Sequence, residues 1–131
     1  MFNKKKQPAI RSLISDGTQI NGPIVFTDGL RVDGTVVGTI QGSEERSSIL
    51  VISETASVTG EVFADHVIIN GTVKGPVHAR LMLELQPRAK IEGDIYYTAL
   101  EMHQGAIIDG RLHPITVDLE VKPTLKLAAN N

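Results

Sequence analysis

The sequence predicts a single-domain, all-β fold, a parallel β-helix of about six coils, and three observations support this prediction. A four-column frame recurs six times along the 131 residues, with a small residue, an aliphatic residue, a glycine and a second aliphatic residue at alternate positions. The steps between the glycines are 16, 22, 15, 18 and 17 residues. Within each frame the side chains alternate with period two, which is typical of strands. A repeat of this length indicates stacked units.

The frame can be followed along the whole chain. Its glycines are Gly22, Gly38, Gly60, Gly75, Gly93 and Gly110. The aliphatic residues before them are Ile20, Val36, Val58, Val73, Ile91 and Ile108, and those after them are Ile24, Ile40, Val62, Val77, Ile95 and Leu112. The small residues are Thr18, Gly34, Ala56, Gly71, Ala89 and Ala106. We expect equivalent residues to stack about 4.8 Å apart, with inward glycines and small residues at narrow corners.

Each element follows from this frame in chain order. The first two frames span 18–24 and 34–40, and the long step after them contains the polar stretch 42–48, which predicts a corner loop. The third frame spans 56–62, and its alternation slips around Asp65 and His66, which predicts a corner. From Val67 to Leu85 the alternation keeps one phase through two coils. Frames at 89–95 and 106–112 complete the solenoid, and a strand-like stretch follows at 115–121.

The domain organisation follows from the extent of the frame. We expect a flexible basic N-terminal arm at 1–13, a β-helix domain at 14–113 and a C-terminal tail at 114–131. A β-sandwich with short strands is the alternative, but sandwiches do not repeat one four-column frame at a fixed period.

Composition and charge narrow the class of protein. The chain has no cysteine, which excludes a disulfide framework and thiolate metal sites. It has no apolar run of membrane-spanning length and no signal-peptide core, so we expect an intracellular protein. The net charge of −2 combines a basic start with an acidic body, which argues against nucleic acid as a partner.

The sequence predicts no enzyme chemistry, and we expect no catalytic residue, cofactor or metal. The sequence contains neither Gly-x-x-x-x-Gly-Lys-Ser/Thr nor a Gly-x-Gly-x-x-Gly that opens a helix. These are the glycine motifs that bind nucleotides, so no nucleotide is expected. The four histidines are scattered and are interpreted as surface residues. Because His66 and His103 lie about two coils apart, a metal site or an acid–base pair between them stays an alternative.

The two ends of the solenoid are the candidate functional surfaces. Each end coil presents unpaired backbone groups, and exposed strand edges promote pairing with another chain unless they are covered. Neither terminal segment resembles a capping helix. We therefore predict stacking of end coils into a homopolymer, with the following interface residues: Ile20, Ile24, Phe26, Ile107, Ile108 and Leu112. The alternative is that the tails fold over the ends and keep the protein monomeric.

The N-terminal arm is the candidate membrane-binding segment, and its residues are Met1, Phe2, Lys4, Lys5 and Lys6. Three lysines at an anionic lipid surface and one inserted phenylalanine contribute about 5 kcal/mol together, a Kd of about 0.2 mM. A monomer would bind poorly, whereas a filament with many arms gains avidity. An ordinary disordered basic tail is the alternative.

The repeated Val/Ile-x-Gly-x-Val/Ile frame, the segments 14–22 and 32–40 and the Met-Phe-x-Lys-Lys-Lys opening together resemble the bactofilins, which are bacterial cytoskeletal polymers. The resemblance implies a right-handed, three-sided β-helix of six coils. It also implies nonpolar filaments that form without nucleotide, peripheral on the cytoplasmic face of the membrane. It further implies a scaffold for cell-wall enzymes such as peptidoglycan hydrolases, with influence on cell shape or polarity. The hydrophobic polymerisation residue of the family falls on Ile108.

Two other functions remain as alternatives. A left-handed hexapeptide-repeat acyltransferase needs an aliphatic residue every six positions, and Val73, Ala79, Leu85 and Ile91 satisfy this only briefly. A monomeric adaptor that binds a partner by its sheet edge is the other. Electron microscopy would distinguish the three functions. Filaments would indicate the cytoskeletal protein, trimers the enzyme and monomers the adaptor.

Overall fold

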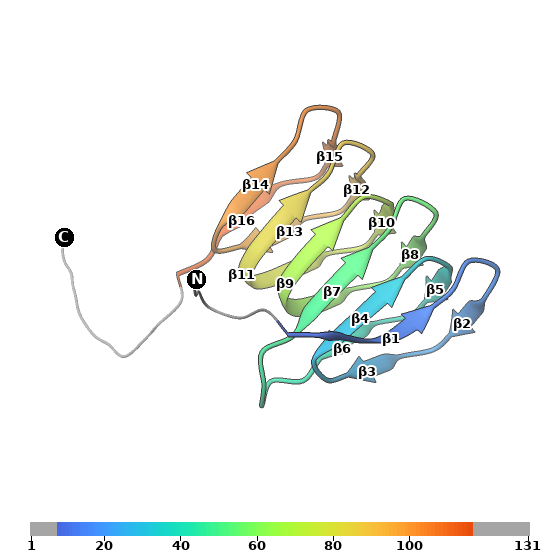
Figure 1. The fold of residues 1–131 in the computed structure, drawn as a ribbon. Helices are drawn as coiled ribbons and strands as arrows, with labels where there is room; N and C mark the ends of the chain where they lie inside the picture. The colour runs from blue at the N-terminus through green and yellow to red at the C-terminus, as the bar shows by residue number, and fades with distance from the viewer. Residues whose placement is uncertain (1–7, 117–131) are drawn as a thin grey trace.

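The computed structural model describes residues 8–116, which form β-strands connected by short turns, without a helix in this range. The strands are β1 (Ile10–Ile14), β2 (Gln19–Asn21), β3 (Ile24–Phe26), β4 (Gly29–Val32), β5 (Thr35–Val37), β6 (Ile40–Gly42), β7 (Ile49–Ile52), β8 (Ser57–Thr59), β9 (Val62–Ile69), β10 (Thr72–Lys74), β11 (Val77–Leu85), β12 (Lys90–Glu92), β13 (Ile95–Tyr97), β14 (Leu100–Met102), β15 (Ile107–Asp109) and β16 (Leu112–Pro114). All pairings between them are parallel and join one coil to the next (Figure 1).

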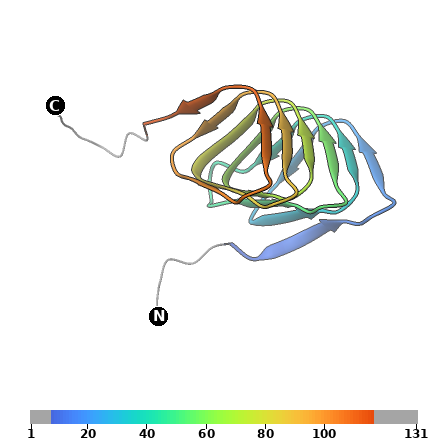
Figure 2. The ribbon, with the colours of Figure 1, turned by 90° about the horizontal axis from the view of Figure 1, so that it is seen from above.

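Six coils stack along one axis and give the solenoid three faces, which confirms the predicted all-β parallel solenoid (Figure 2). Face 1 contains β1, β4, β7, the second halves of β9 and β11, and β14. Face 2 contains β2, β5, β8, β10, β12 and β15. Face 3 contains β3, β6, the first halves of β9 and β11, β13 and β16.

The interior is a ladder of aliphatic side chains, as the frame predicts. On face 2 the aliphatic residues before the glycines pair in register from Ile20 through to Ile108. On face 3 the aliphatic residues after the glycines pair from Ile24 to Leu112. In the four middle coils both columns are fully buried, at 0% exposure. Together with the buried side chains of face 1, such as Leu50 and Leu83, these columns form the apolar core that stabilises the fold.

The frame glycines form a column at the corner between face 2 and face 3. Gly60 and Gly75 both have φ of +147°, a backbone conformation that residues other than glycine rarely adopt. A Cβ atom on Gly75 would also collide with the carbonyl oxygen of Gly60 in the preceding coil. The glycines are therefore required by the turn and by the close stacking of the corners.

The corner between face 3 and face 1 is made in two ways. In β9 the alternation slips at Asp65 and His66, as the sequence predicts, and the strand bends there without ending. In β11 the register shifts between Ala79 and Met82, although the sequence predicts one uninterrupted phase. The predicted phase itself is kept, since Val77, Ala79, Leu83 and Leu85 are all buried. Three residues form this corner, and an odd number leaves the alternation of buried positions unchanged, so the sequence pattern gives no sign of the corner.

The first coil begins earlier than the sequence predicts. Residues 10–14 form β1, which pairs with β4, so part of the expected arm at 1–13 is a paired strand. Asp28 fixes this coil, because its carboxylate lies 3.0 Å from Arg11 Nε and accepts hydrogen bonds from Arg46 Nη2 at 2.6 and 2.7 Å. The predicted 42–48 loop is therefore attached to the first coil through Arg46.

Candidate functional site

The two end coils carry the same inward columns as the middle of the solenoid, but with less cover. At the C-terminal end Ile108 is half-buried and Leu112 is 44% exposed, whereas Ile91 and Ile95 in the preceding coil are 0% exposed. At the N-terminal end Ile20 and Ile24 are half-buried and pack against the core. Among the described strands, those of each end coil pair with the neighbouring coil on one side only. Each end therefore presents apolar side chains together with open strand edges.

Two of the predicted interface residues lie in other environments. Phe26 is 7% exposed, and its ring lies beside Gly42, whose missing side chain leaves room for it. Ile107 is 54% exposed and lies on the outer side of face 2, opposite Lys90 in register. Phe26 thus fills the interior of the first coils, and Ile107 does not extend an interior column.

Face 1 contributes end residues that the sequence interpretation missed. Leu100 and Met102 in β14 pair with Leu83 and Leu85, which are both fully buried, and Met102 is 47% exposed. At the other end Ile14 pairs with Val32 and packs against the core. The alternation of Leu100 and Met102, one coil after Leu83 and Leu85, is the signal that could have identified them.

The last coil is attached to the preceding one by a carboxylate. Asp94 Oδ1 accepts a hydrogen bond from the Arg111 amide at 3.1 Å, and Asp94 Oδ2 lies 3.1 Å from His113 Nε2. The hydrogen bond from the Arg111 amide, and then that from His113, hold the pKa of Asp94 below its usual range. The ionised form of Asp94 therefore stabilises the contact between the last two coils.

A column of rings runs along the outer side of face 3. Phe63, His78, Tyr96 and His113 stack with centroid separations of 4.3, 4.7 and 4.5 Å. His78 Nε2 also lies 2.7 Å from Glu61 Oε2. Since stacked pairs contribute about 0.5–1.5 kcal/mol beyond their buried area, the column strengthens the contacts between coils.

The structure does not bring His66 and His103 together. His66 lies in β9, opposite Met82, whereas His103 follows β14 and its amide donates to the Leu85 carbonyl. The two residues therefore lie at opposite ends of the face 1 strands. The acid–base or metal pair that the sequence leaves open does not form.

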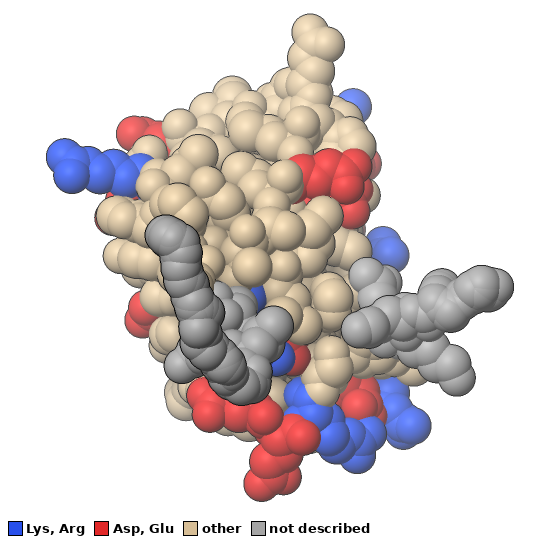
Figure 3. All heavy atoms as spheres, turned by 90° about the vertical axis from the view of Figure 1, so that its left-hand side faces the viewer, with Lys and Arg blue, Asp and Glu red and all other residues tan. Residues whose placement is uncertain are grey.

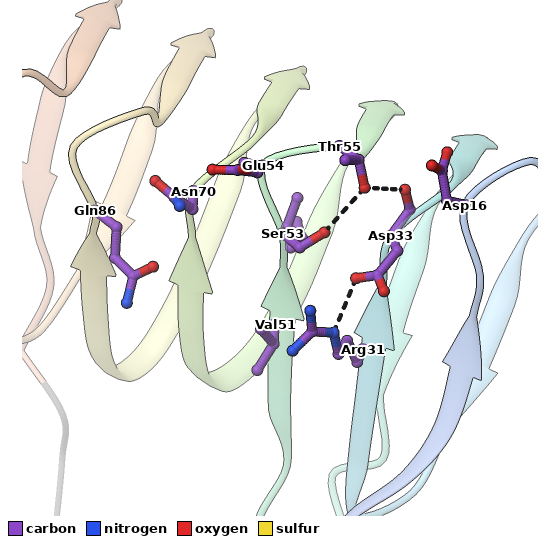
Figure 4. A pocket seen from close by; sticks show the side chains of 10 residues that line it. Asp16, Arg31, Asp33, Val51, Ser53, Glu54, Thr55, Asn70 and Gln86 are labelled. Atoms are coloured by element: carbon purple, nitrogen blue, oxygen red, sulfur yellow. Dashed lines mark hydrogen bonds and ion pairs between the residues drawn. The ribbon is translucent and has the colours of Figure 1, made fainter.

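A polar hollow lies at the corner between face 1 and face 2 (Figure 4). There Arg31 Nε donates to Asp33 Oδ1 at 2.8 Å, and Thr55 Oγ1 donates to the Asp33 carbonyl at 2.7 Å. A hydrogen bond from Ser53, opposed by partial burial, and then the interaction with Arg31 lower the pKa of Asp33. The hydrogen bond from Thr55 joins neighbouring coils, whereas the bond from Arg31 lies within one coil. These contacts give the residues around the hollow a structural role at the corner.

The predicted membrane-binding residues Met1, Phe2, Lys4, Lys5 and Lys6 lie outside the described residues. Within residues 8–116, no helix is long and apolar enough to cross a membrane.

Figure 3 shows acidic and basic side chains gathered at the lower edge of the molecule, where Figure 1 places β3 and the loop after β6.

Comparison with known proteins gives one result. The model of the bactofilin family, described as polymer-forming cytoskeletal, matches residues 12–113. Comparisons with curated proteins and with solved structures found no match. The matched residues include nearly the whole of the six coils described above.

Proposed function

Because the chain belongs to the bactofilin family of polymer-forming cytoskeletal proteins, we propose that it polymerises end to end into nonpolar filaments without nucleotide. The observation that supports this proposal is that the inward side chains are more exposed in the end coil than in the coil next to it. Leu112 is 44% exposed, whereas its partner Ile95 is 0% exposed. A second end coil stacked on the first would bury these side chains and pair the open strand edges.

The experiment is the Ile108→Arg variant, examined by electron microscopy without nucleotide. Ile108 is the half-buried end of the face 2 column, so arginine places a charge in the proposed contact while it leaves the interior of the other coils intact. We expect long filaments to disappear. The matched control is Val37→Arg, because Val37 is an exposed apolar residue on the outer side of face 2 in the second coil. Long filaments of Ile108→Arg, or loss of filaments in Val37→Arg alone, would contradict the proposal.

We also propose that the N-terminal arm attaches the filaments to the inner face of the cytoplasmic membrane. Met1, Phe2 and the lysines at 4–6 supply an apolar anchor and positive charge. One arm supplies only about 5 kcal/mol, so firm binding requires many arms on one polymer. Polymerisation and membrane attachment are then one mechanism.

Pelleting with phosphatidylglycerol vesicles tests the attachment. We expect deletion of residues 2–6 to abolish pelleting with the vesicles while filaments persist, and Ile108→Arg to weaken it although its arm is intact. A Lys74→Ala, Lys90→Ala variant is the control, since it removes two exposed lysines from the body of the solenoid. Unchanged binding after the deletion would reject the role of the arm.

The cellular role that we propose is a scaffold that positions cell-wall enzymes such as peptidoglycan hydrolases and so influences cell shape or polarity. Its support is the membership of a cytoskeletal family and a solenoid whose outer faces would recur regularly along a filament. The Ile108→Arg variant tests this role in cells as well. Loss of filaments should disperse the recruited enzymes, whereas Val37→Arg should leave them in place.

A further inference from the structure

Three metal-ligating side chains meet on the outer side of face 1 near the C-terminal end. Glu84 in β11 and Glu101 in β14 are opposite each other in register. His103 follows β14, and its Nε2 lies 3.1 Å from Glu84 Oε2 and 3.4 Å from Glu101 Oε2. One ligand atom from each residue lies within 4.8 Å of the others. Nothing in the end-to-end contact or in the arm uses this cluster.

The separations fit a small divalent cation. Zinc binds imidazole nitrogen at about 2.0–2.1 Å and carboxylate oxygen at about 2.0–2.2 Å in tetrahedral geometry, so neighbouring ligand atoms are roughly 3.3–3.5 Å apart. The two distances from His103 Nε2 come close to this range. A small rotation of the exposed Glu101 side chain would bring the third distance, between the two carboxylates, into this range.

The backbone holds the cluster in place. Glu84 and Glu101 lie in paired strands, and the amide of His103 donates to the Leu85 carbonyl at 2.9 Å. The Glu84 side chain is 26% exposed, and its register neighbour on the other side is Ile68. Gln86 Nε2 donates to Glu84 Oε2 at 3.5 Å. The ligand carboxylate is therefore oriented by its neighbours before any cation arrives.

The charges at this position favour a bound cation. Two carboxylates directly opposite each other on paired strands repel. Among residues 8–116, no lysine or arginine forms an ion pair with Glu84 or Glu101, and both carboxylates lie beside His103 instead. A divalent cation bound to neutral His103 would neutralise both carboxylates.

We propose that Glu84, Glu101 and His103 form a zinc site with a fourth position open to water. An imidazole nitrogen with two carboxylates suits zinc, whereas magnesium and calcium prefer ligand sets made of oxygen. Bound zinc joins β11, β14 and the turn after β14. It therefore clamps the last coil onto the fifth, independently of whether the ends polymerise.

Isothermal titration of the full chain without a histidine tag, with zinc chloride, tests the site. We expect saturable binding of one zinc per chain, no binding in His103→Ala, and binding weakened at least roughly tenfold in Glu101→Gln, since losing even an outer-shell partner has this effect. His113→Ala is the matched control because His113 is also in the last coil, but among the described residues it lies beside a single carboxylate, Asp94, and not beside two. This variant should bind zinc as the wild type does.

Thermal unfolding without zinc separates loss of the ligand from loss of the fold. His103→Ala and His113→Ala should both remain folded, and added zinc should raise the Tm of the wild type and of His113→Ala only. Three results would overturn the proposal. The first is that the wild type shows no saturable binding, and the second is that His103→Ala binds zinc as the wild type does. The third is that His113→Ala loses binding while His103→Ala retains it.

Discussion

The corner glycines show how single residues determine the shape of the coil. Five of the six frame glycines have φ between +118° and +147°, and from the second coil onward a Cβ atom on each would meet the backbone of the preceding coil. Each glycine therefore satisfies both a turn and a stacking requirement. Any larger residue has to push two coils apart.

This double requirement makes the effect of alanine predictable. We expect Gly17→Ala, at φ of +92° with open space around the position, to cost only backbone strain of about 1–3 kcal/mol. Gly75→Ala should reduce the free energy of unfolding by more than this, because its Cβ atom also collides with the Gly60 carbonyl. Urea unfolding followed by circular dichroism compares the two variants. Equal losses would show that the stacking contact contributes nothing.

The inward columns could be predicted residue by residue, because the spacing of Ile20, Val36 and Val58 from their glycines stays fixed. The interface candidates were harder to identify. Ile107 and Ile108 are adjacent and equally apolar, and the register with Lys90 and Ile91 shows that Ile107 lies on the outer side. Sequence alone did not show that Gly42 makes room for Phe26, since that contact joins two coils.

At the scale of elements, the strands follow the repeat, whereas the corners follow contacts that are distant in sequence. A slip of two residues at Asp65 and His66 changes the alternation and can be predicted, but the three-residue corner at 80–82 does not change it. β1 could not be predicted from periodicity, because Ile10 and Leu13 are 45% and 58% exposed. Its position depends instead on pairing with β4 and on the ion pair between Arg11 and Asp28.

The last coil should be sensitive to acid because Asp94 binds it through the Arg111 amide. The pKa of Asp94 is lowered in the folded protein, so its contribution is present above the unfolded pKa of about 3.9 and is lost as the pH falls through the folded value. We expect the amides of β16 to lose protection before those of β13 below about pH 4.

Hydrogen exchange, corrected for the intrinsic effect of pH on exchange rates, measures this loss. Asp94→Asn should show reduced protection of β16 already at neutral pH and little further change in acid. Asp109→Asn, on the outer side of β15, is the control and should behave as the wild type does. Equal protection of β13 and β16 at every pH would contradict the assignment to Asp94.

At the scale of the whole molecule, the two ends are chemically similar but not identical. Both expose aliphatic residues of the inward columns, yet the first coil also carries the buried Phe26 and the Asp28 ion pairs, and the last coil exposes Met102. The sequence predicted apolar ends because the frame continues unchanged into both. The frame did not show the contribution of face 1 to each end, since that face lies outside its four columns.

Two different ends can build a filament in two ways, and single-end variants distinguish them. In a nonpolar filament each end contacts the same end of its neighbour, so Ile108→Arg should leave the N-terminal contact intact and yield discrete dimers. Ile20→Arg should yield dimers through the C-terminal contact, and the double variant should be monomeric. In a polar filament each contact uses both ends, so either single variant would already be monomeric. Size-exclusion chromatography with light scattering gives the mass of each species, and monomeric single variants would overturn the nonpolar arrangement.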